Sequence, residues 1–378
     1  MKLIAQVKLQ PSKEQATFLK QTLQKTNAAC DAINEIAWKK QVFKQYGLQK
    51  IVYKEIRESF DLAAQIVIRA IAKVADAYKK DKKTKRTFKP LGAIAFDDRI
   101  LSWDTKDRAV SIWTVEGRLC ISYLCGERQR KMLESRQGES DLVFYKGNFY
   151  LLACCEVAEP SPSDYKDALG IDLGITNIAV SSDGEFFSGE PVEKVRGRYL
   201  KLRRALQKRG SKNSACHLKK VAKKESRFRR DKNHCIAKKL VLKAKGTNSA
   251  IGLEDLKHIR ERVTVGRKHR AKHSGWAFHQ LQEFVRYKAR LAGVAVVIVN
   301  ARNSSRECCV CHYVNKRNRR TQAEFRCLNC GLIEHADLNA SKVVAYRATV
   351  NLRIAVCLKL LPTPATGTAS PRIYSWGS

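Results

Sequence analysis

Four cysteines near the C-terminal end form the most specific chemical pattern in the sequence. Cys308 and Cys311 make one Cys-x-x-Cys pair, Cys327 and Cys330 make another, and fifteen residues separate the pairs. This spacing is within the range of zinc ribbons, in which each Cys-x-x-Cys turn directs two thiolates at one centre. Four thiolates complete a tetrahedron and leave no open coordination position, so we predict a structural zinc rather than a catalytic one.

Three acidic residues follow apolar segments and are candidates for a second metal site. Asp172 lies in LGIDLG, Glu254 in AIGLED, and Asp337 in HADLNAS just after the cysteine segment. Three converging carboxylates offer the hard oxygen ligands that Mg²⁺ prefers. Two such ions can activate water and stabilise the leaving oxygen in phosphodiester cleavage. Each acid alone also fits an ordinary turn position, and Asp255 competes with Glu254 for the role.

The charge balance predicts a polyanionic partner. Lys and Arg total 73 against 36 Asp and Glu, which gives a formal net charge of +37. A surplus of this size repels itself in a compact fold, and nucleic acid is the first partner to expect. A membrane surface is the second, but no basic amphipathic anchor, lipidation signal or long apolar run is visible. Nothing in the sequence points to a small-molecule substrate.

The densest basic segment runs from residue 194 to 243 and has the composition of helices. Acidic residues are nearly absent there, so few lysines and arginines have partners on their own helix. A solvated helix face is the ordinary alternative, but phosphate contact explains the missing acids better. The candidate nucleic-acid-binding residues are Arg198, Lys201, Arg203, Arg204, Lys223, Lys224, Arg227, Arg229 and Arg230.

The N-terminal half reads as an all-β module interrupted by helices. Residues 1–10 alternate apolar and polar side chains, which predicts a strand, and Ser12 with Gln15 forms a capping-box pattern that begins a helix. A second helical stretch is expected from about Lys54 to Tyr78. Residues 94–157 alternate around turn residues, as antiparallel strands do, with a hairpin turn at Lys146–Asn148.

The C-terminal half reads as an α/β domain. After a linker at residues 159–164, short apolar strands alternate with helices, which implies a sheet covered by helices. The tail, residues 351–378, is expected to be disordered, above all after Leu361, where Pro, Thr, Ser and Gly accumulate. The N-terminus lacks the apolar core of a signal peptide. We therefore expect a cytoplasmic protein with reduced cysteines.

At these motifs the sequence resembles TnpB, the OrfB product of bacterial insertion sequences. The resemblance spans roughly residues 1–345, and its most specific segments are GIDLGITNIAVSSDG, GLEDLKHIRERV, SSRECCVCH and FRCLNCGLIEHADLNAS, with FRRDKNHCIAKKLV as an accessory segment. It implies an RNA-guided DNA endonuclease related to type V CRISPR effectors, with guide RNA and target DNA as partners. The family's nuclease carboxylates fall on Asp172, Glu254 and Asp337, and its zinc ligands on the four cysteines.

The resemblance also implies a fold, α/β plus all-β. A wedge β-barrel (1–10 and 90–158) is split by a helical recognition insert (11–89). A RuvC-like, RNase H-like nuclease domain (165–304 and 333–350) is split by a zinc ribbon (305–332), and the tail 351–378 follows. This order agrees with the strand and helix order read from periodicity.

The sequence departs from the family pattern near the zinc cysteines. His312 stands where similar sequences usually have Gly, so a positive φ there would strain the backbone. Asn300 and Ala301 replace an expected acid–proline pair. Cys309 and His312 also lie beside the four cysteines and can compete with them as ligands.

Two other functions compete with the guided nuclease. One is a guide-dependent DNA-binding regulator without cleavage, which loss of any of the three acids would indicate, and all three are present. The other is a DNA-binding transposition accessory protein, the older meaning of transposase. A strand-transfer enzyme would use a tyrosine nucleophile with a paired-histidine metal motif, which the sequence lacks.

Overall fold

The computed structural model describes residues 1–161, 165–256 and 278–360, and the structural statements below concern these residues. The chain divides after Ala158 into a first unit, Met1–Ala158, and a second unit, Glu159–Ser378. The predicted linker begins at this border, and its residues 162–164 lie outside the described part. Each unit has its own buried apolar core.

The first unit is built on an antiparallel sheet that forms a nearly closed barrel. Its strand order is β2-β6-β7-β1-β5-β4-β3. The predicted N-terminal strand is central, pairing with β5 and β7, and it buries Ala5, Val7 and Leu9 on one face. The strands are β1 (Lys2–Leu9), β2 (Ile94–Phe96), β3 (Leu101–Asp104), β4 (Ala109–Thr114), β5 (Gly117–Leu124), β6 (Arg136–Tyr145) and β7 (Asn148–Glu156).

Helices interrupt the sheet between β1 and β2, as predicted. The capping box is present, because the Ser12 hydroxyl accepts from the Gln15 N–H at 3.2 Å and the Gln15 side chain accepts from the Ser12 N–H at 3.0 Å. Such reciprocal bonds satisfy backbone donors that the first turn leaves free. The helices of the first unit are α1 (Lys13–Lys40), α2 (Gln45–Phe60), α3 (Ala64–Lys80) and, between β5 and β6, α4 (Glu127–Leu133).

The single helical stretch expected from Lys54 to Tyr78 is wrong, because the chain forms two helices there. Asp61 ends α2 in the left-handed region, with φ of 39°. Aspartate tolerates this conformation better than most residues, so the chain turns before α3 begins at Ala64. The Lys146–Asn148 turn is confirmed: Lys146 and Gly147 have φ of 51° and 80°, as a two-residue hairpin turn requires.

The second unit is built on a mixed five-stranded sheet with the order β10-β9-β8-β11-β12. β8, β11 and β12 are parallel, which matches the alternation of strands and helices, and β9 and β10 add antiparallel strands at one edge. The strands are β8 (Ala168–Asp172), β9 (Asn177–Ser181), β10 (Phe186–Ser188), β11 (Ala250–Glu254) and β12 (Val296–Val299).

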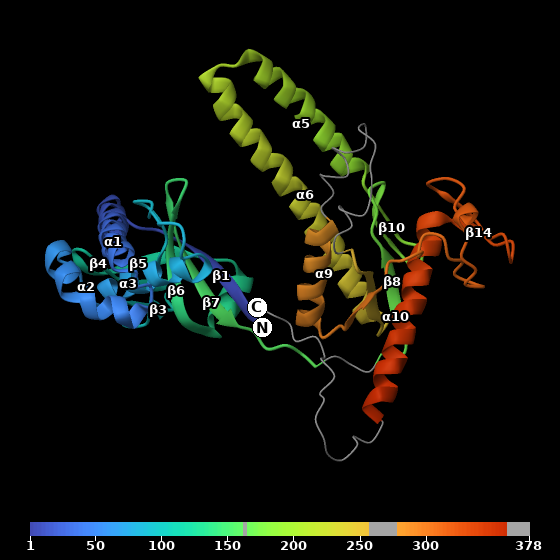
Figure 1. Cartoon of the computed structure of the whole chain (residues 1–378), viewed down its shortest axis with the longest axis horizontal. Helices are drawn as coiled ribbons and strands as arrows, with labels where there is room; N and C mark the ends of the chain where they lie inside the picture. The colour runs from blue at the N-terminus through green and yellow to red at the C-terminus, as the bar shows by residue number, and fades with distance from the viewer. Residues whose placement is uncertain (162–164, 257–277, 361–378) are drawn as a thin grey trace. The chain divides into compact units, whose positions relative to one another are not determined.

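One face of this sheet carries α10 (Ala336–Leu360), which packs along β8 and β11 (Figure 1). Two glycines permit the close approach. A Cβ added at Gly170 would lie 2.1 Å from the Ser341 carbonyl oxygen, and one at Gly252 would lie 2.8 Å from the Ala348 Cβ. Since a side chain at either position would push the helix away, these glycines set the position of α10 over the strands.

The expected boundary of a disordered tail at residue 351 is wrong, because α10 continues to Leu360. The segment Asn351–Leu360 contains no Gly or Pro, so nothing in it stops a helix that began upstream. Residues 361–378 lie outside the described part of the chain.

Two long helices form a hairpin that projects from the sheet of the second unit (Figure 1). They are α5 (Glu190–Arg209) and α6 (Lys212–Gly246), and Gly210, with φ of 65°, makes the turn between them. α9 (Phe278–Ala292) packs on α6, and Gly293 closes it as predicted, with φ of 72°. Among the described residues, no helix is long and apolar enough to cross a membrane.

Candidate functional site: a carboxylate cluster beside a four-cysteine module

The three predicted acids come together at the carboxyl ends of two central strands of the second unit's sheet. Asp172 ends β8 and Glu254 ends β11, and these parallel strands pair with Ile171 beside Leu253, so the two acids follow in register. Residues in register on neighbouring parallel strands point to the same face. Asp337 is the second residue of α10, which packs on both strands. The fold therefore brings together residues that are 165 positions apart in the sequence, from 172 to 337.

Burial and mutual repulsion of the three carboxylates shift the pKa values in this cluster. Desolvation by the surrounding protein raises the pKa of Asp172 well above its ordinary value, and the charges of Glu254 and Asp337 raise it further. Desolvation also raises the pKa of Glu254, which is 6% exposed, although a hydrogen bond from Ser304 opposes this. Glu254 Oε1 has no hydrogen-bond partner among the described residues. A buried carboxylate oxygen without a partner is suited to a cation.

Asp337 is held by two donors from different parts of the unit. Arg319 Nη2 donates to its Oδ1 at 3.1 Å, and Asn177 Nδ2 donates to its Oδ2 at 3.0 Å. The Asp337 backbone N–H donates to His335 Nδ1 at 3.2 Å, which caps the start of α10. Asp337 thus has a fixed orientation at a helix N-terminus, where the backbone favours negative charge.

Asp255, which competed with Glu254 for the site, lies elsewhere. It directly follows β11, so it points to the opposite face from Glu254. Its side chain is exposed, and its backbone N–H donates to the Val299 carbonyl at 2.8 Å. The geometry supports Glu254 as the member of the cluster.

The four predicted zinc cysteines also come together. The Sγ atoms of Cys308, Cys311, Cys327 and Cys330 lie within 4.8 Å of one another. Hydrogen bonds from the Tyr313 backbone N–H and from the Asn329 side chain lower the pKa of Cys311 to about 6, whereas burial raises the pKa of Cys308 to about 12. The donor set fits a tetrahedral soft-metal site with no position left open.

The neighbouring Cys309 and His312 lie outside this group and have other partners. Cys309 Sγ lies 3.7 Å from Glu334 Oε2, and its pKa is raised to about 11 by burial and by that carboxylate. His312 Nδ1 lies 2.9 Å from Glu307 Oε1. His312 has φ of 58°, so the backbone strain that a positive φ would cause at this position applies.

Short elements connect the two cysteine turns and follow the second. The 3₁₀ turn η1 (Lys316–Asn318) and β13 (Glu324–Arg326) lie between the turns, and β14 (Ile333–His335), which pairs with β13, comes after the second turn. Arg319 lies between η1 and β13. Among the described residues that connect the two cysteine turns, it alone donates a hydrogen bond to the carboxylate cluster. Sequence reasoning missed it, because Arg317, Arg319 and Arg320 look alike in a basic segment.

The predicted basic segment lies on α5 and α6, but its members are not equivalent. Arg203 forms an ion pair with Glu225 across the hairpin, with both side chains partly buried. Arg229 is also partly buried. The remaining candidates are exposed: Arg198, Lys201, Arg204, Lys223, Lys224, Arg227 and Arg230.

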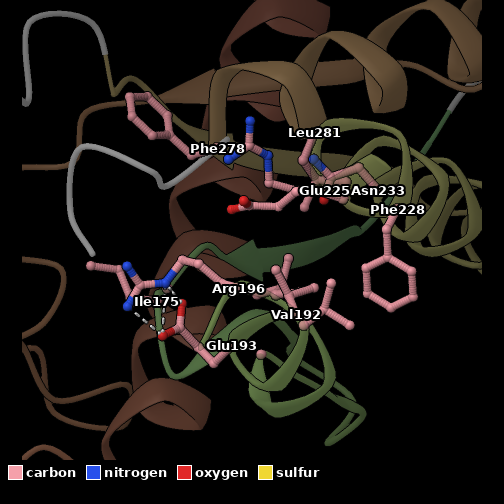
Figure 2. Close-up of a pocket in the computed structure, with 14 residues that line it drawn as sticks. Ile175, Val192, Glu193, Arg196, Glu225, Phe228, Asn233, Phe278 and Leu281 are labelled. Atoms are coloured by element: carbon pink, nitrogen blue, oxygen red, sulfur yellow. Dashed lines mark hydrogen bonds and ion pairs between the residues drawn. The ribbon is translucent and has the colours of Figure 1, made fainter. Parts of the chain in front are cut away.

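A pocket that sequence reasoning did not predict lies beside the loop after β8 (Figure 2). Ile175 from this loop, Val192 from α5, Phe228 from α6 and Leu281 from α9 form much of its apolar lining. Its charged side chains include an ion pair at 2.9 Å between Arg196 and Glu193. Because the pocket is the apolar junction of four elements, we assign it no ligand.

Comparison with solved structures identifies the class of fold. The cryo-EM structure of a Cas12f1–sgRNA–target DNA complex has a TM-score of 0.60, with 15% identity over 88% of this chain and 83% of that chain. A Cas12f1 endodeoxyribonuclease of Syntrophomonas palmitatica is 33% identical over 123 residues, which is 32% of this chain but 24% of that longer relative. The fold is thus shared with Cas12f-type effectors.

Sequence comparison identifies the family. The OrfB_IS605 model, described as probable transposase, matches residues 153–258, and a Cas12f1-like TNB domain model matches residues 278–344. A TnpB-like protein of Methanocaldococcus jannaschii is 30% identical over 239 residues, which is 59% of this chain and 84% of that relative. The chain belongs to the TnpB family.

Proposed function

We propose that this protein is an RNA-guided, Mg²⁺-dependent DNA endonuclease encoded by a transposable element. The observation that carries the proposal is the gathering of Asp172, Glu254 and Asp337 at one sheet edge, with a buried Glu254 oxygen that has no partner in the described chain. We propose guide RNA and target DNA as its partners, because a relative is named a CRISPR-associated endodeoxyribonuclease and a Cas12f1 protein was solved in complex with sgRNA and target DNA. We also propose that it acts in the cytoplasm of a bacterium, on the DNA of the nucleoid.

The donor chemistry fits a hard divalent cation. Carboxylate oxygens are the ligands that Mg²⁺ prefers, and a cation would offset the desolvation and the repulsion that raise the pKa of Asp172. When bound, two Mg²⁺ ions would supply Lewis acidity for hydrolysis of a phosphodiester bond. The residues that would hold them are Asp172, Glu254 and Asp337.

The neighbouring side chains complete the proposed nuclease site. Asn177 and Arg319 hold Asp337 in one orientation, and Ser304 does the same for Glu254. The Arg319 guanidinium also places positive charge beside the cluster. A guanidinium there is suited to the negative oxygens of a phosphate, so we propose that Arg319 contacts the scissile group.

The four-cysteine module is proposed to hold a structural zinc. Four thiolates satisfy the metal completely, and a closed site has no place for a reacting water. The exposed arginines and lysines that were predicted to bind nucleic acid on α5 and α6 are proposed to contact phosphates, because among the described residues they have no ion pair with an acid such as Arg203 has.

The test is a cleavage assay with purified protein and its co-purifying RNA. Changing the guide portion of the RNA should redirect cleavage to a matching DNA, and chelator should stop it. Asp172→Ala should bind the guide and target but not cut, because affinity comes from many basic contacts. Asp255→Ala is the matched control and should cut normally.

Three outcomes would overturn the proposal. Purified protein without associated RNA would favour the simpler DNA-binding accessory protein, and robust cleavage by Asp172→Ala would place the chemistry elsewhere. A protein that binds RNA and matching DNA but never cuts would be the DNA-binding regulator.

A further inference from the structure

The four-cysteine module, residues 308–330, is fastened to the helix that carries Asp337. The fastening residue is Asn339, which is fully buried on α10 two positions after Asp337. Its Nδ2 donates to the Glu307 carbonyl at 2.7 Å, and its Oδ1 accepts from the Cys309 N–H at 2.9 Å. Both bonds go to backbone groups that flank Cys308, so one amide side chain clamps the first cysteine turn to α10.

A second link lies beside the first. Glu307 is 8% exposed, and its carboxylate receives Arg347 from α10 as well as His312 from the first cysteine turn. The first turn is therefore held to α10 at two points, about two helical turns apart along the helix, from Asn339 to Arg347.

The hydrogen bonds continue from the first cysteine turn to Arg319. Asn318 is fully buried, and its Nδ2 donates to the carbonyls of Arg306 at 3.0 Å and Tyr313 at 3.1 Å. Its Oδ1 accepts from the Leu328 N–H, between the second pair of cysteines, at 3.1 Å. The next residue, Arg319, donates to Asp337. The position of Arg319 therefore depends on both cysteine turns being in place.

We propose that Asn339 is a positioning residue that docks the four-cysteine module on α10 and so keeps Arg319 on Asp337. Docking of the module thereby controls the charge of the carboxylate site. This inference rests on the proposed function only in taking the carboxylate cluster as a cation site. It gives the metal-holding module a role in the nuclease site beyond its own stability.

Undocking of the module should change the affinity of the carboxylate cluster for a divalent cation in a direction that disruption of the fold would not produce. Arg319 adds a positive charge next to three acids, and this charge opposes the binding of another cation. If the module undocks, the cluster becomes more negative and should bind a divalent cation more tightly, while cleavage falls because Arg319 is lost. Disruption of the fold would weaken cation binding and cleavage together.

The experiment measures Mn²⁺ binding to the full chain by calorimetry without nucleic acid, alongside zinc content and cleavage. The heat of Mn²⁺ binding that is lost in Asp172→Ala is assigned to the carboxylate cluster. We expect Asn339→Ala and Arg319→Ala each to tighten this binding several-fold and to reduce cleavage, with zinc content unchanged. The double variant should show no further tightening, since both changes remove one interaction.

Asn351→Ala is the matched control, because Asn351 is an exposed asparagine on the same helix. It should leave Mn²⁺ binding and cleavage as in the wild type. If Asn339→Ala loses zinc or unfolds, Asn339→Ser keeps a hydroxyl in the buried position and is measured instead.

Unchanged Mn²⁺ affinity in a folded, zinc-containing Asn339 variant would overturn the inference, as would effects that add in the double variant. Failure of the proposed function has a different signature, because wild type and Asp172→Ala would then bind Mn²⁺ equally.

Discussion

At the scale of residues, the cluster of Asp172, Glu254 and Asp337 is unfavourable for the metal-free fold. Burial and mutual repulsion raise the pKa of Asp172 and burial raises that of Glu254, so ionising both costs folding free energy. Proteins tolerate such groups where function requires them, which is why a perturbed carboxylate in a cluster indicates a site.

The first prediction is that Asp172→Asn stabilises the metal-free protein while abolishing cleavage. The substitution removes one of three repelling charges, and we expect about 1 kcal/mol, or a Tm increase of about 2–4 °C for a unit of this size. Calorimetry in chelator measures it. A Tm below that of the wild type would show that the Asp172 carboxylate stabilises the fold.

The pH dependence of this difference has a definite sign. Because the folded-state pKa of Asp172 is raised, the folded state holds more protons than the unfolded state. The stability that this group contributes is therefore present below its unfolded pKa and is lost as pH rises through the folded pKa. We expect the Tm advantage of Asp172→Asn to grow with pH, and an advantage confined to acidic pH would contradict this.

A second prediction concerns Arg319. Its guanidinium contacts Asp337 and supplies positive charge at the cluster, so Arg319→Ala should reduce cleavage by about 10²–10³-fold, as loss of a charge-stabilising donor does. Arg320→Ala is the matched control, since Arg320 is an exposed neighbour. Single-turnover cleavage rates measure both, and equal losses would show that only the overall charge of the segment matters.

At the scale of elements, the α5–α6 hairpin presents charge in two ways. Arg203 is neutralised by Glu225, whereas Arg204, Lys223 and Lys224 are exposed. Sequence reasoning placed all four in one binding set, because the partner of Arg203 lies on the other helix and pairs with it only when the hairpin closes.

A third prediction follows for the salt dependence of nucleic-acid binding. Each phosphate contact contributes about 0.9 to the log–log slope on duplex DNA, so replacing Arg204, Lys223 and Lys224 with Ala should flatten the slope by about 2–3. Affinity measured across a salt series tests this. Arg203→Ala should change the slope less than Arg204→Ala, and an unchanged slope in the triple variant would mean that these charges face only solvent.

A fourth prediction concerns the four-cysteine module as an element. The strand within it, β13, and the strand that pairs with it, β14, are only three residues long, so we expect a bound metal to supply much of its stability. Purified protein should hold about one zinc per chain, and Cys327→Ser should lower zinc content and Tm together. Cys309→Ser is the control, since Cys309 lies outside the cluster. Full zinc content in Cys327→Ser would contradict the assignment.

At the scale of the whole molecule, the net charge of +37 dominates. Self-repulsion of this size opposes a compact state and is relieved by a polyanion. A fifth prediction is that RNA at about 100 times its Kd stabilises the protein by about 2.7 kcal/mol, seen as a higher Tm. High salt should remove the effect, and an uncharged polymer should produce none. A Tm that RNA leaves unchanged at low salt would contradict this prediction.

The sequence alone determined the features that depend on local order. Hydrophobic alternation predicted β1, the Ser12–Gln15 pattern predicted the start of α1, and the spacing of the cysteines predicted their cluster. These succeed because each depends on groups within a few residues of one another, or on a spacing that few structures share.

Tertiary structure decided which charged side chains meet and why. The resemblance placed Glu254 rather than Asp255 in the site, and the face of β11 that each side chain occupies gives the physical reason. The partner of Arg203 depends on the closing of the α5–α6 hairpin. Arg319 looks like its basic neighbours until the folded module brings it to Asp337. These pairings join residues far apart in sequence, so local order does not specify them. The packing of α10 on the sheet, which two glycines permit, brings Asp337 to the other two acids.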